Sequence, residues 1–271
     1  MPLSTDPVAP VAPAWSCSVP LAGVYRRLAE VSPLVKLGVG RGPGAAAGWI
    51  EGHRLGQGPD GVESLVVAEE RRIEAAYGVA PRRDVAATWA LHRYAFTACL
   101  AMSGPWYLEQ RVPKVALDGV AYHWKERELA VEAEAMVCLP GDPLAGRPGV
   151  RTVGGAEELR AELRDAVAAH LAPVLEAFRP YVRRRPHALW GMATDQLAGG
   201  VWHVGRALGD ATAATRAADA LLPGNTPPFT GAAGFRPSCD PGGEPTRTRT
   251  GCCLYYTIRP DDLCATCPRA R

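Results

Sequence analysis

The chain has 271 residues, of which 47% are hydrophobic and 21% are charged, and its formal net charge at pH 7 is +2. These values are typical of a globular protein with a sizeable core, built as one large domain or as one domain with a small appendage. The small net charge and the lack of basic blocks interleaved with aromatic residues argue against nucleic acid as a partner.

The N-terminal stretch predicts neither a secretory signal nor a membrane anchor. Residues 1–16 are proline-rich and have no basic segment before an apolar one, so we expect a disordered tail. No later window holds the roughly 20 consecutive apolar residues that a membrane-spanning helix requires. The sequence therefore predicts a cytoplasmic protein, and weak peripheral contact with a membrane through basic residues stays open.

The first half of the chain predicts two helices separated by an irregular region. Apolar periodicity over residues 21–32 indicates the first helix, whereas residues 38–61 contain too many glycines for a regular element. The almost uniformly apolar run 85–102 predicts a buried helix that ends at Gly104–Pro105.

Short strands are predicted next, followed by a group of helices. Alternating apolar positions around residues 112–138 indicate half-buried strands, two of them joined by a turn at Asp118–Gly119. Apolar stripes then predict helices over residues 157–178, 188–209 and 212–222. Pro173 is expected to kink or split the first of these helices.

This pattern predicts an α+β fold that is mostly α-helical, with a small strand region and a C-terminal appendage. Six prolines among many glycines mark the approach to the appendage as an extended linker. The expected divisions are a Pro-rich tail (1–16), a mostly helical substrate-docking body (17–222), a linker (223–250) and a cysteine-bearing segment (251–271).

Four of the eight cysteines, Cys252, Cys253, Cys264 and Cys267, lie in the last twenty residues. In a reducing compartment such a cluster indicates a metal site rather than disulfides, and thiolates suit zinc or an iron–sulfur cluster. Structural zinc sites usually present two C-x2–4-C pairs and this tail has one, which favours an iron–sulfur cluster over zinc or a non-metal role. Both neighbouring cysteines reach one cluster only if the backbone turns sharply, which Gly251 would permit.

The spacing C-C-x10-C-x2-C at the C-terminus resembles the 2Fe-2S domain of the FhuF-type ferric-siderophore reductases. The segments HLAPVLEAF (170–178) and ALWGMATDQLAGG (188–200) are similar to the helical part of that family, so the resemblance covers about residues 157–271. It implies a 2Fe-2S cluster held by the four cysteines and the one-electron reduction of siderophore-bound Fe(III) to Fe(II). It also favours hydroxamate siderophores as substrates.

Such a reaction is chemically reasonable, because reduction lowers the charge density of iron and so weakens its binding to hard oxygen donors. The apolar side chains beside the cysteines are Leu254, Tyr255, Tyr256 and Ile258. They could limit water access to the cluster and tune its potential, or simply pack the appendage on the helical body, and the two interpretations are compatible. Gly40-x-Gly42-x-x-Ala45 matches a dinucleotide fingerprint in form, but further glycines leave no helix to follow it. We therefore expect electrons from a partner protein such as a ferredoxin or a flavin reductase.

A basic and aromatic group between two predicted helices is the candidate substrate site, and it comprises Arg183, Arg184, Arg185, His187 and Trp190. These side chains suit a ferric chelate, an acidic electron donor or anionic lipid, although a solvated basic helix end is the simpler interpretation. Buried cysteines are usually inert, so Cys17, Cys99 and Cys138 are not expected to act. Cys239 stays open as a substitute ligand.

Two other functional classes stay open at this point. The protein could be a non-catalytic 2Fe-2S electron carrier, or an iron-sensing or siderophore-binding protein. A zinc-stabilised module is the third alternative, and it would be colourless.

Overall fold

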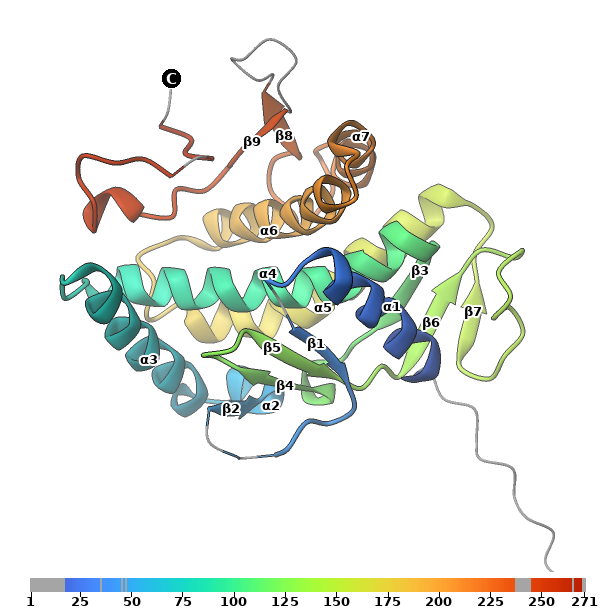
Figure 1. Ribbon diagram of the computed structural model, residues 1–271, viewed down its shortest axis with the longest axis horizontal. Coiled ribbons are helices and arrows are strands. Elements are labelled where there is room, and N and C mark those ends of the chain that lie inside the picture. Colours follow the sequence, from blue (N-terminus) through green and yellow to red (C-terminus); the bar gives the residue numbers. More distant parts are fainter. Residues whose placement is uncertain are drawn as a thin grey trace, which may run out of the picture.

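The computed structural model describes residues 18–269 apart from residues 35, 45, 47, 237–244 and 265. Within these residues the chain is mainly α-helical and carries three small sheets, which confirms the predicted α+β class (Figure 1). The helices are α1 (Ser18–Val31), α2 (Gly52–Gly56), α3 (Pro59–Tyr77), α4 (Arg83–Glu109), α5 (Ala156–Phe178), α6 (Pro186–Ala207) and α7 (Ala211–Leu221). The predicted tail, residues 1–16, lies outside the described residues.

The strands form sheets with the orders β1-β5-β4-β2, β3-β6-β7 and β8-β9. Their bounds are β1 (Lys36–Val39), β2 (Trp49–Glu51), β3 (Arg111–Lys114), β4 (Val120–His123), β5 (Glu128–Val131), β6 (Ala135–Cys138), β7 (Val150–Thr152), β8 (Gly234–Arg236) and β9 (Thr246–Thr248). In the first sheet β5 pairs in parallel with β1, with Lys36 opposite Glu128, and antiparallel with β4. Figure 1 shows this sheet beneath α4 and the second sheet near the C-terminal end of α4.

Helix α4 is the centre of the molecule because its sequence is apolar on nearly every face. It runs past the predicted end at Gly104–Pro105 and continues to Glu109. Pro105 has no N–H for the carbonyl of Ala101, and the hydroxyl of Tyr25 on α1 donates to that carbonyl instead (3.0 Å). The helix therefore keeps its backbone satisfied while it contains a proline.

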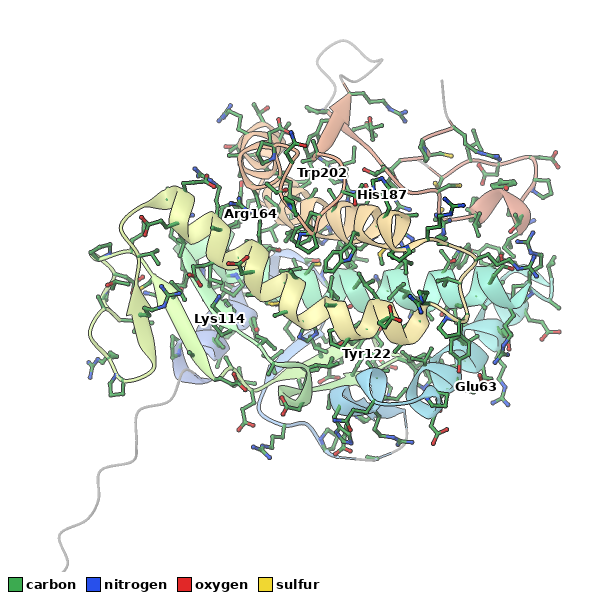
Figure 2. The ribbon with its side chains drawn as sticks, turned by 180° about the vertical axis from the view of Figure 1, so that it is seen from behind. Glu63, Lys114, Tyr122, Arg164, His187 and Trp202 are labelled. Carbon is green, nitrogen blue, oxygen red and sulfur yellow. The ribbon has the colours of Figure 1, made fainter. Side chains whose placement is uncertain are left out.

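Helix α5 packs along the back of α4, as the reverse view shows (Figure 2). It remains one helix through Pro173, so the expected split into two helices does not occur. Lys114 of β3 reaches α5 and forms an ion pair with Glu162 (2.6 Å). The second sheet is in this way tied to the helical layer.

Two sequence expectations near the sheets were wrong. Residues 38–61, expected to be irregular, contain part of β1, all of β2 and α2, and the start of α3, because their glycines allow close backbone contacts. A Cβ atom at Gly52, for example, would lie 1.9 Å from the carbonyl oxygen of Leu117. Strands β3 and β4 do flank Asp118–Gly119, but they belong to different sheets and do not pair.

The segment that follows α7 packs on α6 on its way to the cysteines. Ala233 N–H donates to the carbonyl of Leu222 (2.8 Å), and Thr194 Oγ1 on α6 donates to the carbonyl of Thr230 (3.0 Å). Phe229, which lies in the same segment, is buried. The division of the chain into body, linker and cluster segment stays a prediction. No helix within the described ranges has both the length and the hydropathy to cross a membrane.

Candidate iron–sulfur site

A buried carboxylate on α6 fixes the backbone that precedes the paired cysteines. Asp195 is 3% exposed, and its two oxygens accept hydrogen bonds from the N–H groups of Thr250 and Gly251, both at 2.8 Å. Arg247 lies 3.7 Å away as its counter-charge. Burial raises the pKa of Asp195, while these N–H groups and arginines oppose that rise. Sequence reasoning missed this residue, whose only signal was a lone acid in an apolar helix.

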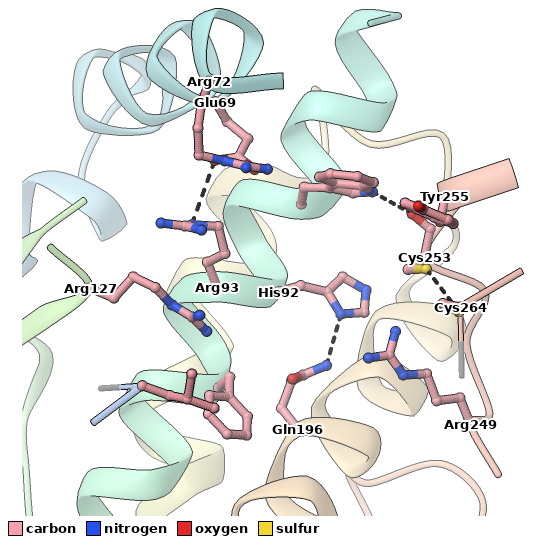
Figure 3. Close-up of a pocket in the computed structure, with 13 residues that line it drawn as sticks. Glu69, Arg72, His92, Arg93, Arg127, Gln196, Arg249, Cys253, Tyr255 and Cys264 are labelled. Atoms are coloured by element: carbon pink, nitrogen blue, oxygen red, sulfur yellow. Dashed lines mark hydrogen bonds and ion pairs between the residues drawn. The ribbon is translucent and has the colours of Figure 1, made fainter. Parts of the chain in front are cut away.

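The carbonyl groups of both adjacent cysteines are also held by side chains of the helical body. Trp89 on α4 donates from Nε1 to the carbonyl of Cys253 (2.7 Å), and Arg184 donates to the carbonyl of Cys252. The ring of Tyr255 stacks on Trp89, with a centroid separation of 6.0 Å and an interplanar angle of 16°. Helices α4 and α6 thus position the start of the cysteine segment from two sides (Figure 3).

The four predicted ligands lie in this segment, and two of their sulfur atoms meet. Cys253 Sγ and Cys264 Sγ are 3.5 Å apart, and Cys252 Sγ accepts a hydrogen bond from the N–H of Leu254 at 3.5 Å. Cys267 is 2% exposed, and its N–H donates to the carbonyl of Cys264 (2.9 Å). In the described part of the chain, no three histidine, cysteine or acidic side chains converge as metal ligands.

The sharp turn expected at Gly251 occurs three residues later. Leu254 has a φ of +63°, in the left-handed region that non-glycine residues rarely adopt, whereas Gly251 has no positive φ. Gly251 instead contributes its N–H to Asp195, and a Cβ atom there would be in ordinary van der Waals contact with Asp195 Oδ2, at 3.4 Å.

The donor chemistry of this segment fits a metal cluster. Burial raises the pKa of the Cys264 thiol to about 12, and the neighbouring Cys253 adds to that rise. A bound cation reverses this preference because it stabilises the thiolate form. The N–H donated to Cys252 Sγ is a contact of the kind that tunes an iron–sulfur centre.

A pocket of about 390 Å³ lies directly beside two of these cysteines (Figure 3). Helix α4 presents one face to it, through Trp89, His92, Arg93 and Phe96, at the spacing that aligns side chains on a helix. The other lining residues are Leu34, Glu69, Arg72, Arg127, Gln196, Arg249, Cys253, Tyr255 and Cys264. Segments far apart in sequence therefore build one cavity against the cysteine segment.

The polar groups of the pocket are partly paired. Glu69 is 3% exposed and accepts three hydrogen bonds from Arg72, the shortest 2.7 Å, while Arg93 Nε lies 3.6 Å from it. Gln196 Nε2 donates to His92 Nδ1 (2.8 Å). Burial lowers the pKa of His92 to about 3, and nearby arginines lower it further, so this imidazole is neutral.

The predicted substrate residues lie outside this pocket, and they are Arg183, Arg184, Arg185, His187 and Trp190. Arg183 lines another depression, with Arg82 and Asp84, at the N-terminal end of α4. Trp190 packs edge-on against Phe229, with ring centroids 5.6 Å apart. Arg184 is the one that reaches the cysteine segment, through the Cys252 carbonyl. Their role in substrate binding stays a prediction.

The apolar side chains around the cysteines have different surroundings. Tyr255 lines the pocket, Ile258 is buried in the main core, and Leu254 packs against that core. Tyr256 instead lies beneath the guanidinium of Arg269, 4.1 Å from its ring centroid. They do not form one continuous wall.

The remaining cysteines divide into two groups. Cys99 and Cys138 are buried, and burial raises the pKa of both thiols, as expected of inert cysteines. Cys17 and Cys239 lie outside the described residues.

The helical body carries a docked cysteine segment beside a charged pocket, and the family match of that segment indicates an iron–sulfur redox protein. Residues 249–269 match the family model of the FhuF 2Fe-2S C-terminal domain. The matched residues include Cys252, Cys253, Cys264 and Cys267, and the cofactor of the chain is accordingly a 2Fe-2S cluster. No curated protein matches the chain significantly.

Proposed function

We propose that this protein reduces siderophore-bound Fe(III) to Fe(II) at the pocket beside Cys253 and Cys264, with a 2Fe-2S cluster held by the four C-terminal cysteines. The observation that carries this proposal is the position of those two cysteines in the pocket lining. A chelate in the pocket would be next to the cluster ligands, with no protein layer between them.

The size of the pocket supports a small-molecule substrate. Its volume of about 390 Å³ lies in the lower part of the range, roughly 300–1,000 Å³, that such sites occupy. A siderophore would place its iron-bearing part in the pocket and leave the remainder in solvent. Leu34, with 54% of its surface exposed, lies at the mouth.

The four C-terminal cysteines would hold the cluster, which when bound would supply one electron to Fe(III) and regain it from an external donor protein of the ferredoxin or flavin reductase class. The residues of the chain provide a rigid setting for this transfer. Asp195 and Trp89 hold the cysteine backbone, and the Gln196–His92 hydrogen bond fixes the facing side chains. Reduction weakens the hold of the hard oxygen donors, and Fe(II) is released in the cytoplasm.

The experiment is an anaerobic single turnover. The purified protein is reduced with dithionite, excess reductant is removed, and a ferric chelate is added with a chromogenic Fe(II) trap. We expect the visible cluster absorbance to bleach on reduction and to return as trapped Fe(II) forms. A coloured protein whose reduced form ignores every ferric chelate would contradict the proposal and would favour an electron carrier or an iron sensor.

The ligand set is tested separately by a pair of cysteine variants. Cys264→Ser should lower the iron and sulfide content and the visible absorbance, because a hydroxyl is a poor replacement for a thiolate. Cys99→Ala changes a buried cysteine outside the site and should keep both. Equal iron content in the two variants would overturn the proposed ligand set.

A further inference from the structure

Arg127 occupies an unusual position on the wall of the pocket that faces the cysteines. It lies in the turn between β4 and β5, where its φ of +53° is in the left-handed region. Its Nε atom is buried and has no hydrogen-bond partner in the described part of the chain. Buried polar groups are normally paired, so an unpaired Nε–H on a guanidinium that lines the pocket, at a strained backbone position, is consistent with a ligand in the pocket.

The charges around Arg127 point to the kind of ligand. Arg93 is its neighbour, and burial together with this like charge lowers the pKa of Arg127. Glu69 is the carboxylate of this wall, and its oxygens are already engaged by Arg72 and, at longer range, by Arg93. An anion between Arg93 and Arg127 would relieve their repulsion.

The negative charge of a cluster does not account for this pair. Arg249 and Arg184 lie beside the cysteines. Arg184 donates a hydrogen bond to the Cys252 carbonyl, and the charge of Arg249 opposes the rise in the pKa of Cys264. In Figure 3 the guanidinium groups of Arg127 and Arg249 approach the pocket from opposite sides. The pocket lining holds four guanidinium groups and one carboxylate among the described residues, and His92 is neutral.

We propose that this pocket selects ferric chelates with a net negative charge, held by catecholate or carboxylate oxygens, and that Arg127 and Arg93 bind that charge. This inference rests on the proposed function and names its substrate class. Each catecholate group carries two negative charges and each hydroxamate one, so a tris-catecholate ferric complex is strongly anionic and a tris-hydroxamate complex is neutral.

The aromatic lining is consistent with the same class. Trp89, Phe96 and Tyr255 border the pocket, and catecholate rings offer π-faces that such side chains pack against. Hydroxamates lack these rings. The charge of the pocket thus departs from the hydroxamate substrate that the family resemblance favours.

The test measures binding with redox-inert Ga(III) complexes, which share the charge of the ferric ones. Calorimetric titration of the cluster-loaded protein compares Ga(III) held by three catechols, by citrate, and by three hydroxamates on the catechol scaffold. We expect the anionic complexes to bind at least about tenfold more tightly than the neutral one, and to weaken at high salt. Arg127→Gln should abolish this preference, and Arg127→Lys should retain most of it.

Arg26→Gln, at an exposed position on α1, is the matched control for loss of one positive charge. Equal or tighter binding of the hydroxamate complex to the wild type would overturn the inference, as would identical behaviour of Arg127→Gln and Arg26→Gln. Binding of the catecholate alone, independent of salt, would assign selection to stacking and would also overturn it.

Reduction of the matching Fe(III) complexes separates this inference from the proposed function. If anionic complexes bind in an Arg127-dependent way but no ferric chelate is reduced, the proposed reductase function is refuted and the preference for anionic chelates stands. Equal reduction of all chelates by the wild type and Arg127→Gln would keep the reductase and refute the selectivity.

Discussion

Asp195 joins the helical body to the cysteine segment through two backbone hydrogen bonds of 2.8 Å. It also balances the charge of Arg247, which is itself 7% exposed. Two backbone donors and one buried cation therefore depend on a single carboxylate. Removal of the Asp195 charge should therefore destabilise the cysteine segment more than the helical body.

Asp195→Asn should destabilise the segment, because an amide offers one acceptor oxygen where two N–H groups need partners, and it leaves Arg247 without its counter-charge. We expect a loss of about 2–4 kcal/mol in the free energy of unfolding and faster release of iron. Asp210→Asn makes the same change at the N-cap of α7, where an Asn side chain caps as well as Asp, and it should leave both stability and iron release close to wild type. Iron release at wild-type rate from Asp195→Asn would contradict this role.

His170 makes stability depend on pH, since it is buried neutral between two partners. Its Nδ1 donates to the carbonyl of Val115 (3.0 Å) and its Nε2 accepts from the hydroxyl of Tyr94 (2.9 Å). Burial lowers the pKa of His170 from 6.5 to about 4, so below pH 6.5 the unfolded chain binds more protons than the folded one. Its contribution to stability is complete above pH 6.5 and is lost as the pH falls towards 4.

Chemical denaturation between pH 7 and pH 5 checks this dependence. The stability advantage of the wild type over His170→Gln should shrink by about 2 kcal/mol over this interval, by the linkage slope of a single titrating group. His187→Gln, at an exposed position on α6, should follow the wild-type curve. Parallel curves for the wild type and His170→Gln would show that this imidazole does not carry the effect.

Among the elements, α4 and α6 frame the site, and both were predicted from apolar periodicity. The pocket-lining face of α4 was not predicted, because His92 and Arg93 stand among apolar residues that by themselves indicate a buried helix. Their function depends on neighbours from other elements, such as Gln196 on α6 and Glu69 on α3. Periodicity shows which face of a helix is buried, but not what another segment brings to that face.

The contact between α6 and α7 leaves no room for a side chain at Gly205. A Cβ atom there would lie 2.2 Å from the Cβ of Ala214 and 3.1 Å from the carbonyl oxygen of Asp210. Gly205→Ala should therefore lower the free energy of unfolding by about 1–3 kcal/mol, as overpacking does, despite the better helix propensity of alanine.

Gly23 on α1 is the matched control, because nothing lies within 4 Å of a Cβ atom at that position. Gly23→Ala should stabilise the protein by about 0.5–1 kcal/mol. The measurement is the denaturant midpoint of the wild type and of both variants. A Gly205→Ala variant more stable than the wild type would disprove the close packing of α6 on α7.

For the molecule as a whole, the sequence indicated the cofactor but not the site around it. The four cysteines lie within sixteen residues, so their spacing alone carried the chemistry. The pocket combines α3, α4, the β4–β5 turn, α6 and the C-terminal segment, and no local pattern connects these. The basic group at 183–185 was conspicuous in sequence, whereas Arg127 and Arg249 are far apart in sequence and only the fold brings them together.

The central claim, that electrons reach the chelate through this pocket, is tested most directly by obstruction of its mouth. Leu34 at the mouth and Leu208 beyond the end of α6 have similar exposure, 54% and 48%, so Leu34→Trp and Leu208→Trp form a matched pair. The measurement is the stopped-flow rate of reoxidation of the dithionite-reduced protein by the ferric chelate that the wild type reduces fastest.

The account predicts that Leu34→Trp slows this reoxidation about tenfold, because the chelate loses its productive position. Leu208→Trp should keep the wild-type rate, and both variants should react normally with hexacyanoferrate(III), a small oxidant. Equal rates for Leu34→Trp and Leu208→Trp with the chelate would contradict the account and move the site of electron transfer elsewhere on the surface.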